Sequence, residues 1–399
     1  MFRSSDSASE IVKATQDSAS PPRIPLFPSC TLQRNSLYEI DSHLPGARQP
    51  LAQPLSLVVP PAAKQTSITR PTALPSLPVE FSEGANAPMS PPTAIRASMA
   101  TGYSFPPEIA QKVDAVFGAP VRAGGLAEFF SPVLPQATWE IRNPEPDGTG
   151  VSFHITAVAK NGAIDFQTGW AIRRDTDGAI ELHVFDLHVA PHRRGHGLTS
   201  HIEKRTTALL RAFSLNEQTR ITAVAGFNND PNTGRPQLGI GTYLHAVRGY
   251  LYADEAGVSS EYFIFSEPRS DMSERQRLAS DFDAWVETEP TLQYRNRSLT
   301  LPERRPLRGL AGRCEQPFEL AKLDISGLTA LVEGADGRST RTSLGKAFLL
   351  SGHASIWCAV RFINDAAQDS PPHIKALRLA SKKQFEQHCS QPRPEFQQR

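Results

Sequence analysis

The chain has 399 residues, which is enough for two domains or for one domain with long extensions. Its 42 lysines and arginines nearly balance its 41 aspartates and glutamates, so the formal net charge of +1 favours neither nucleic acid nor a membrane surface as a partner. No segment reaches the roughly 18–20 consecutive apolar residues of a membrane-spanning helix, so no membrane span is expected.

The cysteines are few for a chain of this length, and their spacing matches neither a disulfide framework nor a metal site. They are Cys30, Cys314, Cys358 and Cys389. We therefore expect buried thiols, no metal and a reducing environment.

Residues 1–100 differ in composition from the rest of the chain. They are rich in proline and serine, and the pairs Pro21-Pro22, Pro60-Pro61 and Pro91-Pro92 remove backbone donors that helices and sheets need. We expect a disordered leader without the apolar segment of a secretory signal. In composition this leader resembles the export signal of bacterial type III secreted effectors, which implies delivery into a host cell. A plain linker or tail of a cytoplasmic protein is the alternative.

The predicted elements begin near Pro107. A helix over Pro107–Phe117 ends at Gly118, and a short second helix contains Leu126, Phe129 and Phe130. Four strands follow, and the turns between them contain the Asp-Gly and Asn-Gly pairs that are typical of hairpins, so an antiparallel meander is expected. The strands are predicted over Thr138–Arg142, Val151–Lys160, Ile164–Arg173 and Ile180–Val189.

Helices and strands then alternate. The predicted elements are a helix over Thr199–Phe213, a strand over Ile221–Ala225, a helix over Gly239–Val247 and a strand over Ser259–Phe265. An antiparallel meander followed by this alternation predicts an α+β fold in which helices flank a mixed central sheet. We assign this domain to residues 101–290.

The last part of the chain gives weaker signals. A helix is predicted over Arg275–Val286, and arginines and prolines over residues 291–308 indicate a linker. Short apolar runs and a final helix after Pro371-Pro372 follow. We expect residues 291–399 to form a small carboxyl-terminal α/β module or an extension of the main domain.

A glycine-containing turn between the fourth strand and the following helix is the strongest functional signal. Glycines let the backbone approach an anion closely, and the amino end of a helix supplies free N–H groups and a partial positive charge. The sequence therefore predicts a pyrophosphate site. Its residues are Arg194, Gly195, His196, Gly197, Leu198 and Thr199.

This turn and the order of elements resemble the GNAT acetyltransferase superfamily over roughly residues 107–267. The family's pyrophosphate motif, [Q/R]-x-x-G-x-[G/A], is matched at Arg194–Thr199, with threonine at the last position. Val189–Arg194 likewise resembles the family's V-x-P-x-x-R segment.

The resemblance implies a transferase that moves an acetyl group from acetyl-coenzyme A to an amine of a protein or small molecule, without a covalent enzyme intermediate. It implies that the fourth strand separates from its neighbour and that its backbone near Leu187 and Val189 pairs with the pantetheine arm. Asn228 or Asn229 is a candidate to bind the pantetheine or the region around the departing sulfur; an ordinary turn is the alternative.

The resemblance also implies an acid that protonates the departing thiolate. Aligned on Gly249-Tyr250, the family's tyrosine position holds His245, while Tyr243 lies two residues earlier and faces another side of the helix. Either side chain is a candidate acid, and packing is the alternative for both.

For the base, the fourth strand offers four titratable side chains. Alternation places Glu181 and His183 on one face and Asp186 and His188 on the other. The resemblance points to His183, with Glu181 nearby, and histidine accepts a proton near neutral pH. Cross-strand hydrogen bonding is the alternative role for all four.

The sequence thus predicts an acyl-coenzyme A-dependent N-acetyltransferase that uses acetyl-coenzyme A as co-substrate. The alternative is a non-catalytic interaction protein with the same fold, because the threonine at position 199, the shifted tyrosine and the long extensions fit a protein that has lost cofactor binding.

Overall fold

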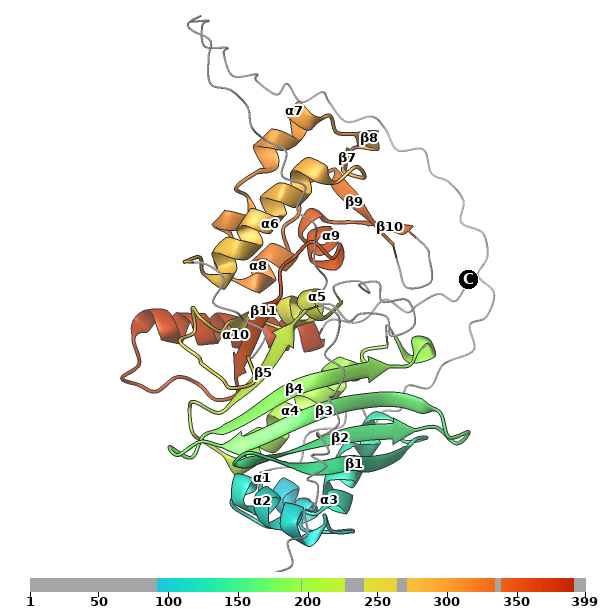
Figure 1. Ribbon diagram of the computed structural model, residues 1–399, viewed down its shortest axis with the longest axis vertical. Coiled ribbons are helices and arrows are strands. Elements are labelled where there is room, and N and C mark those ends of the chain that lie inside the picture. The colour runs from blue at the N-terminus through green and yellow to red at the C-terminus, as the bar shows by residue number, and fades with distance from the viewer. Residues whose placement is uncertain (1–91, 195, 227–239, 264–270, 334–338, 391–399) are drawn as a thin grey trace, which may run out of the picture. The chain divides into compact units, whose positions relative to one another are not determined.

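The described elements belong to one compact unit, Ser76–Arg399. The computed structural model describes residues 92–194, 196–226, 240–263, 271–333 and 339–390 (Figure 1). Its α-helices are α1 (Pro92–Met99), α2 (Pro107–Phe117), α3 (Ala123–Phe130), α4 (Leu198–Phe213), α5 (Ile240–Val247), α6 (Glu274–Thr288), α7 (Leu301–Arg304), α8 (Pro317–Ala321), α9 (Leu344–Leu350) and α10 (Pro372–Ser390). Its strands are β1 (Thr138–Asp147), β2 (Gly150–Val158), β3 (Ile164–Arg174), β4 (Ile180–Val189), β5 (Arg220–Ala225), β6 (Leu251–Tyr252), β7 (Gln293–Tyr294), β8 (Arg297–Ser298), β9 (Leu328–Glu333), β10 (Ser339–Thr342) and β11 (Trp357–Phe362).

The main sheet has seven strands in the order β1-β2-β3-β4-β5-β11-β6. Strands β1 to β4 pair antiparallel with successive neighbours, which confirms the predicted meander. Helix α4 connects β4 to β5, and these two strands are parallel. Strand β11, from near the end of the chain, pairs antiparallel with both β5 and β6. The fold is therefore the mixed α+β class that the sequence predicts.

The hairpin turns of the meander depend on glycine. Gly162 and Gly178 have φ values of 83° and 84°, in the left-handed region that residues with a Cβ rarely adopt. Because both lie in turns predicted from Asn-Gly and Asp-Gly pairs, local sequence was sufficient to locate these hairpins.

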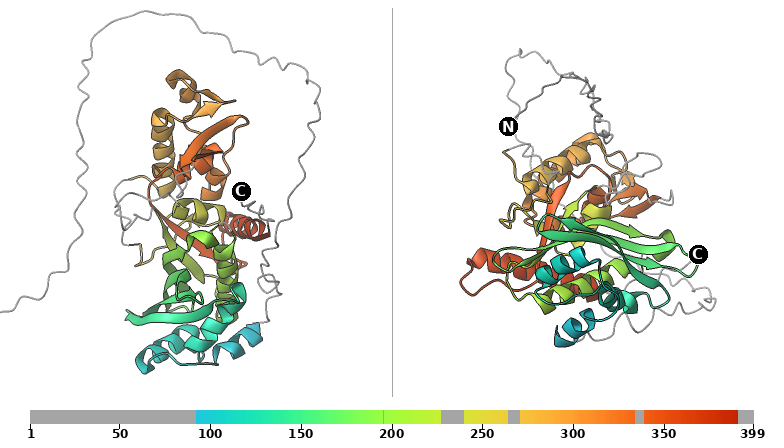
Figure 2. Two further views of the ribbon diagram at one scale, coloured as in Figure 1. Left: turned by 90° about the vertical axis from the view of Figure 1, so that its right-hand side faces the viewer. Right: turned by 60° about the horizontal axis from the view of Figure 1, so that its bottom comes forward.

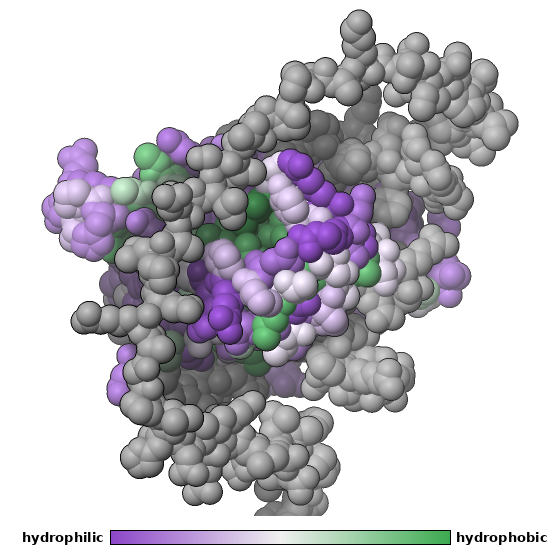
Figure 3. Space-filling view, turned by 90° about the horizontal axis from the view of Figure 1, so that it is seen from above, coloured by the Kyte–Doolittle hydropathy of each residue, from purple (hydrophilic) through white to green (hydrophobic). Residues whose placement is uncertain are grey.

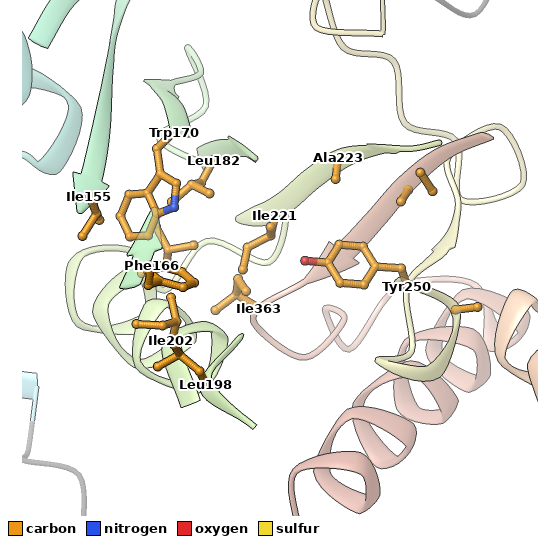
Figure 4. Close-up of a cluster of buried hydrophobic side chains, with 14 of the residues drawn as sticks. Ile155, Phe166, Trp170, Leu182, Leu198, Ile202, Ile221, Ala223, Tyr250 and Ile363 are labelled. Atoms are coloured by element: carbon orange, nitrogen blue, oxygen red, sulfur yellow. The ribbon is translucent and has the colours of Figure 1, made fainter. Parts of the chain in front are cut away.

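Helices α1 to α4 cover one face of the main sheet (Figure 2). Phe166 and Trp170 of β3 pack there with Leu198 and Ile202 of α4 (Figure 4), and all four side chains are buried. Burying a side chain of this size contributes about 1.5–3 kcal/mol. This packing holds the amino end of α4 against the sheet.

Residues 253–356 form a long insertion between β6 and β11 (Figure 1). It contains a second, four-stranded sheet in the order β10-β9-β7-β8. Phe282 and Trp285 of α6 pack on Phe348 of α9, and these side chains belong to the same hydrophobic core as the main sheet.

Several boundaries predicted from sequence were wrong. The disordered leader predicted over residues 1–100 is too long, and order begins before Pro107, because residues 92–99 form α1 and bury Ile95 and Met99 against the main unit. The strand predicted over Ser259–Phe265 is not formed at residues 259–263; β11 instead completes the sheet beside β5, a long-range pairing that local sequence does not encode. Residues 291–308 are not a bare linker, since they contain β7, β8 and α7.

The carboxyl-terminal residues 291–399 contribute to both sheets. Strand β11 is built into the main sheet, and α10 packs near α4 and α5. Of the two predicted alternatives, these contacts favour an extension of the main domain over a separate module.

Candidate functional site

The turn that joins β4 to α4 carries the predicted anion-binding motif. Gly197 caps the amino end of α4 with a φ of 83°, which explains the need for glycine there. The N–H groups of Ser200 and His201 donate to the carbonyl oxygen of Gly197 at 2.9 and 3.1 Å. No described residue accepts a hydrogen bond from the N–H of Leu198 or Thr199. Two backbone donors without a described acceptor and the partial positive charge of the helix end are features that favour an anion.

The two arginines of the turn have different roles. Arg193 forms an ion pair with the buried Asp165 at 2.9 Å and thereby anchors the turn to β3. Arg194 is exposed, and its Nε donates to the carbonyl oxygen of Val189 at 3.0 Å. Its terminal guanidinium nitrogens can reach a bound anion from the solvent side.

The remaining predicted cofactor-binding residues are only partly described. His196 is half-buried in the turn. Gly195, Asn228 and Asn229 lie outside the described residues.

Strands β4 and β5 pair over only part of their length, and Figure 1 shows them diverging. Their parallel register ends at Val184 and Ala223. Beyond that point Leu187 and Val189 pair with β3, and no described residue of β5 pairs with them. Among the described residues, no strand pairs with the edge of β4 that is turned toward β5 over residues 185–189.

Glu181 is the centre of a buried ion-pair network. Its carboxylate accepts hydrogen bonds from Arg173 at 2.9 Å and from Arg220 at 2.6 Å. The hydroxyl groups of Thr222, at 3.2 Å, and Ser260 also donate to it. Burial raises the pKa of Glu181, but Arg220, Ser260 and Arg173 outweigh burial and lower the pKa below its usual range. A carboxylate with both oxygens engaged is a poor base, so the geometry argues against Glu181 in that role.

His183 lies beside this network and is 5% exposed. Its Nδ1 is 3.1 Å from Oγ1 of Thr222, whose single proton is already donated to the ionised Glu181. We therefore assign the proton of neutral His183 to Nδ1, which leaves the lone pair on Nε2. Burial lowers the pKa of His183 to about 4, although Glu181 and Asp147 act in the opposite direction. At neutral pH His183 is uncharged, and its lowered pKa makes it a weaker proton acceptor than an ordinary histidine.

A segment that sequence reasoning did not connect with the site covers His183. The ring of Tyr262 stacks on the His183 ring with centroids 4.8 Å apart. Its hydroxyl donates to Asp147 at 2.8 Å, and the guanidinium of Arg173 lies 5.3 Å from its ring centroid. The same segment supplies Ser260 to Glu181. Residues 260–262 are thus held in place over the polar face of β4.

A second buried ion-pair network joins α4 to β11 and to the residue after α5. Glu203 of α4 forms ion pairs of 3.0 Å with both Arg248 and Arg361, and it accepts a hydrogen bond from Tyr250. Burial raises the pKa of Glu203, but the charges of Arg361 and Arg248 outweigh burial, so the pKa lies below its usual value. Arg248 also donates to Oγ1 of Thr199, which gives the threonine of the motif a structural role. Sequence reasoning missed this network because Glu203 and Arg361 are 158 residues apart.

The two candidate acids lie on different sides of α5. His245 packs edge-to-face on Tyr250, with ring centroids 4.7 Å apart, and its buried Nδ1 has no partner among the described residues. Burial and Arg248 lower the pKa of His245 to about 4, although Glu203 acts in the opposite direction. Tyr243 instead lies against α9, where Lys346 is 5.3 Å from its ring centroid. Burial raises the pKa of Tyr243.

A β-bulge in β4 changes which side chains share a face. The register with β3 shifts by one residue between Val184 and Asp186, so Phe185 is an extra residue. An extra residue reverses the alternation, and Asp186 and His188 therefore lie on the face that carries His183. The prediction that they lie on the opposite face was wrong, because it assumed an unbroken strand.

Other features of the described residues are remote from this site. A surface hollow of about 350 Å³ is lined by residues of α6 and its neighbours, and none of them belongs to β4 or α4. Figure 3 shows the upper face, where hydrophilic side chains border a smaller apolar area set back between them. Within the described ranges no cluster of three or more His, Cys, Asp or Glu could hold a metal ion, and no helix is long and apolar enough to cross a membrane.

No protein-family model matches the chain, and no curated protein matches its sequence significantly. A functional assignment therefore depends on the geometry of the residues described above.

Proposed function

We propose that this chain is an acyl-coenzyme A-dependent N-acyltransferase, similar to the GNAT superfamily, that transfers an acetyl group from acetyl-coenzyme A to an amine of a protein or small molecule. The amino end of α4 carries the proposal. The N–H groups of Leu198 and Thr199 have no described acceptor there, and β4 leaves β5 at the same end of the sheet. A diphosphate fits such a group of donors, and Arg194 adds a positive charge.

The proposed diphosphate site and the proposed catalytic side chains lie on opposite faces of the main sheet. Helix α4 packs on the face that carries Leu182, whereas His183 and Asp186 project from the other face. An extended thioester whose diphosphate is bound by α4 reaches these side chains along the unpaired edge of β4. The divergence of β4 and β5 is therefore required for the reaction that we propose.

His183 is the base in this proposal, and Glu181 positions it through Thr222. Nε2 of His183 takes a proton from the ammonium group of the acceptor, and the amine nitrogen then forms a bond to the thioester carbonyl carbon. The carbon–sulfur bond breaks, the nitrogen gives up its second proton as the amide forms, and the thiolate takes up one proton. Direct transfer depends chiefly on holding the amine and the thioester in line.

The protonation states of His245 and Tyr243 at neutral pH distinguish the two candidate acids. His245 is uncharged at neutral pH because its pKa is about 4, so it has no imidazolium proton to give. Tyr243 keeps its hydroxyl proton at neutral pH because burial raises its pKa. We therefore expect Tyr243→Phe to lower kcat more than His245→Asn in an assay at pH 7.5, and the reverse order would assign the role to His245.

One observation favours the alternative, a non-catalytic interaction protein. Tyr262 stacks on His183, and His183 is 5% exposed, so an acceptor amine reaches Nε2 only if residues 260–262 move. A protein that binds acetyl-coenzyme A without transferring the acetyl group, or that binds no acyl-coenzyme A, would fit this closed arrangement.

Binding is tested by thermal denaturation with and without acetyl-coenzyme A. At a ligand concentration 100 times Kd, mass action stabilises the folded state by about 2.7 kcal/mol, which raises Tm by roughly 2–4 °C. Gly197→Ala places a Cβ at the motif and is expected to abolish this rise. Gly162→Ala is the matched control, because Gly162 also has a φ of 83° but lies in a distant hairpin turn. It should lower Tm and keep the ligand-induced rise.

Turnover is tested with radiolabelled acetyl-coenzyme A and a cell lysate. We expect label on an amine of a protein or small molecule, and His183→Asn should reduce transfer at least about 100-fold, the usual contribution of a positioned base. His188→Asn, at an exposed position of the same strand, is the control. Binding without any transfer would instead support the non-catalytic alternative.

The expectation of a type III export leader stays a prediction, because residues 1–91 lie outside the described residues. Its test is a deletion of residues 1–50 in a secretion assay. Export that continues unchanged would contradict it.

A further inference from the structure

We propose that Phe185, Asp186 and His154 form the acceptor subsite and bind a primary ammonium group. This inference depends on the proposed transferase function, because it names where the acceptor sits. None of these residues is in the ion-pair network around Glu181, and all three lie on the face of the sheet that carries His183.

The carboxylate of Asp186 is held in position by its neighbours, but its oxygens can still accept hydrogen bonds from a ligand. Gln167 donates to Oδ2 at 2.9 Å, and Nε2 of His154 lies 3.7 Å from the same oxygen. The side chain is 39% exposed, and no lysine or arginine in the described part of the chain pairs with it. Glu181, by contrast, is fully buried and paired with two arginines. Asp186 can therefore accept hydrogen bonds from an incoming cation, which Glu181 cannot.

Phe185 supplies an exposed aromatic surface beside this carboxylate. It is the extra residue of the β4 bulge and is 48% exposed. Its ring packs edge-to-face on His154, with centroids 5.3 Å apart, and it covers Gly169. A Cβ at position 169 would lie 2.4 Å from Cε2 of Phe185, so the ring needs glycine beneath it. Bulges often redirect a side chain at a functional site, and an aromatic ring face attracts cations.

A carboxylate beside an exposed phenyl ring matches the chemistry of a primary ammonium group on an alkyl chain, such as a lysine side chain. Asp186 is three residues from His183, which corresponds to roughly 10 Å along an extended strand. After residues 260–262 move away from His183, the ammonium group passes from Asp186 to Nε2 of His183 and loses one proton there. The resulting amine forms the new carbon–nitrogen bond as the carbon–sulfur bond breaks. The nitrogen gives up its second proton as the amide forms, and the thiolate takes up one proton.

The test measures binding of n-butylammonium to the full chain without acetyl-coenzyme A, by NMR titration, with n-butanol as the uncharged comparison. We expect saturable binding of the cation, weaker binding of the alcohol, and a Kd about five- to tenfold higher in Asp186→Asn, as for the loss of one partly exposed charged hydrogen bond. Phe185→Leu should also raise Kd. Glu140→Gln is the matched control, because Glu140 lies on the same sheet and is 40% exposed, and it should leave Kd unchanged.

The outcomes separate this inference from the proposed function. Equal Kd in wild type, Asp186→Asn and Glu140→Gln would overturn the subsite even if acetyl transfer is observed. Loss of cation binding in Asp186→Asn alone would support the subsite even if no acetyl transfer is found, in which case the transferase proposal fails by itself. Thermal denaturation of each variant shows that a loss of binding is not a loss of folding.

Discussion

The two halves of β4 contain similar residues but have opposite roles. In the first half Glu181 and His183 are buried between β3 and β5. Arginines and hydroxyl groups engage the carboxylate of Glu181, and Thr222 contacts Nδ1 of His183, whereas Nε2 of His183 keeps its lone pair. In the second half Asp186 and His188 have β3 as their one described neighbouring strand, and both are at least partly exposed. The presence or absence of β5 therefore decides which carboxylate of β4 stabilises the sheet and which is open to a ligand.

The largest expected difference between the two halves is in stability. Glu181→Gln leaves Arg173 and Arg220 without their shared charge in a buried site, and should destabilise the fold by about 3–5 kcal/mol. Asp186→Asn removes one partly exposed charge and should cost less than about 1 kcal/mol. Urea denaturation of both variants measures the difference. Equal losses would show that the two halves are not energetically distinct.

A smaller effect is expected in the pH dependence of stability. The pKa of His183 is about 4 in the folded chain, below the value of 6.5 expected when it is unfolded, because burial disfavours the charged form. The unfolded state therefore binds the proton first as pH falls from 6.5 to 4, and the folded state loses on the order of 3 kcal/mol over this window, with no effect above it.

His183→Asn should remove that part of the acid sensitivity, and His188→Asn should retain it. Denaturation midpoints between pH 4 and pH 7.5 provide the measurement. An unchanged pH profile in His183→Asn would mean that the ring is not buried as described.

The smallest expected change in stability comes from a substitution at the β4 bulge. Gly169→Ala places a Cβ 2.4 Å from the Phe185 ring, and because Phe185 is exposed the ring can rotate away at a cost of about 1 kcal/mol. The same substitution in a Phe185→Ala background should cost less, since the clash is gone. A double-mutant cycle measures this coupling. Additive losses would contradict the contact between Phe185 and Gly169.

Local sequence signals predicted the elements that depend on neighbouring residues. The meander, its glycine turns and the α4 helix follow from alternation, from Asn-Gly and Asp-Gly pairs and from helical spacing. They also predicted the glycine turn before α4, because glycine at position 197 and the helix after it are adjacent in the chain.

Long-range contacts could not be predicted in the same way. The pairing of β11 with β5, the Glu203–Arg361 ion pair and the cover of Tyr262 over His183 join segments far apart in the sequence. The bulge at Phe185 was missed because alternation continues in the sequence where the strand itself shifts register. The sequence placed His183, the candidate base, on a strand that the structure shows as β4, but its closed surroundings were not foreseen.

The central claim is that the first N–H groups of α4 bind a diphosphate. The most direct measurement is the ¹H–¹⁵N spectrum of the labelled chain during titration with acetyl-coenzyme A. We predict saturable shifts of the Leu198 and Thr199 amides, with the amide of Gly162 unchanged. Binding that leaves the Leu198 and Thr199 amides unmoved, or the absence of binding at millimolar ligand, would contradict the account.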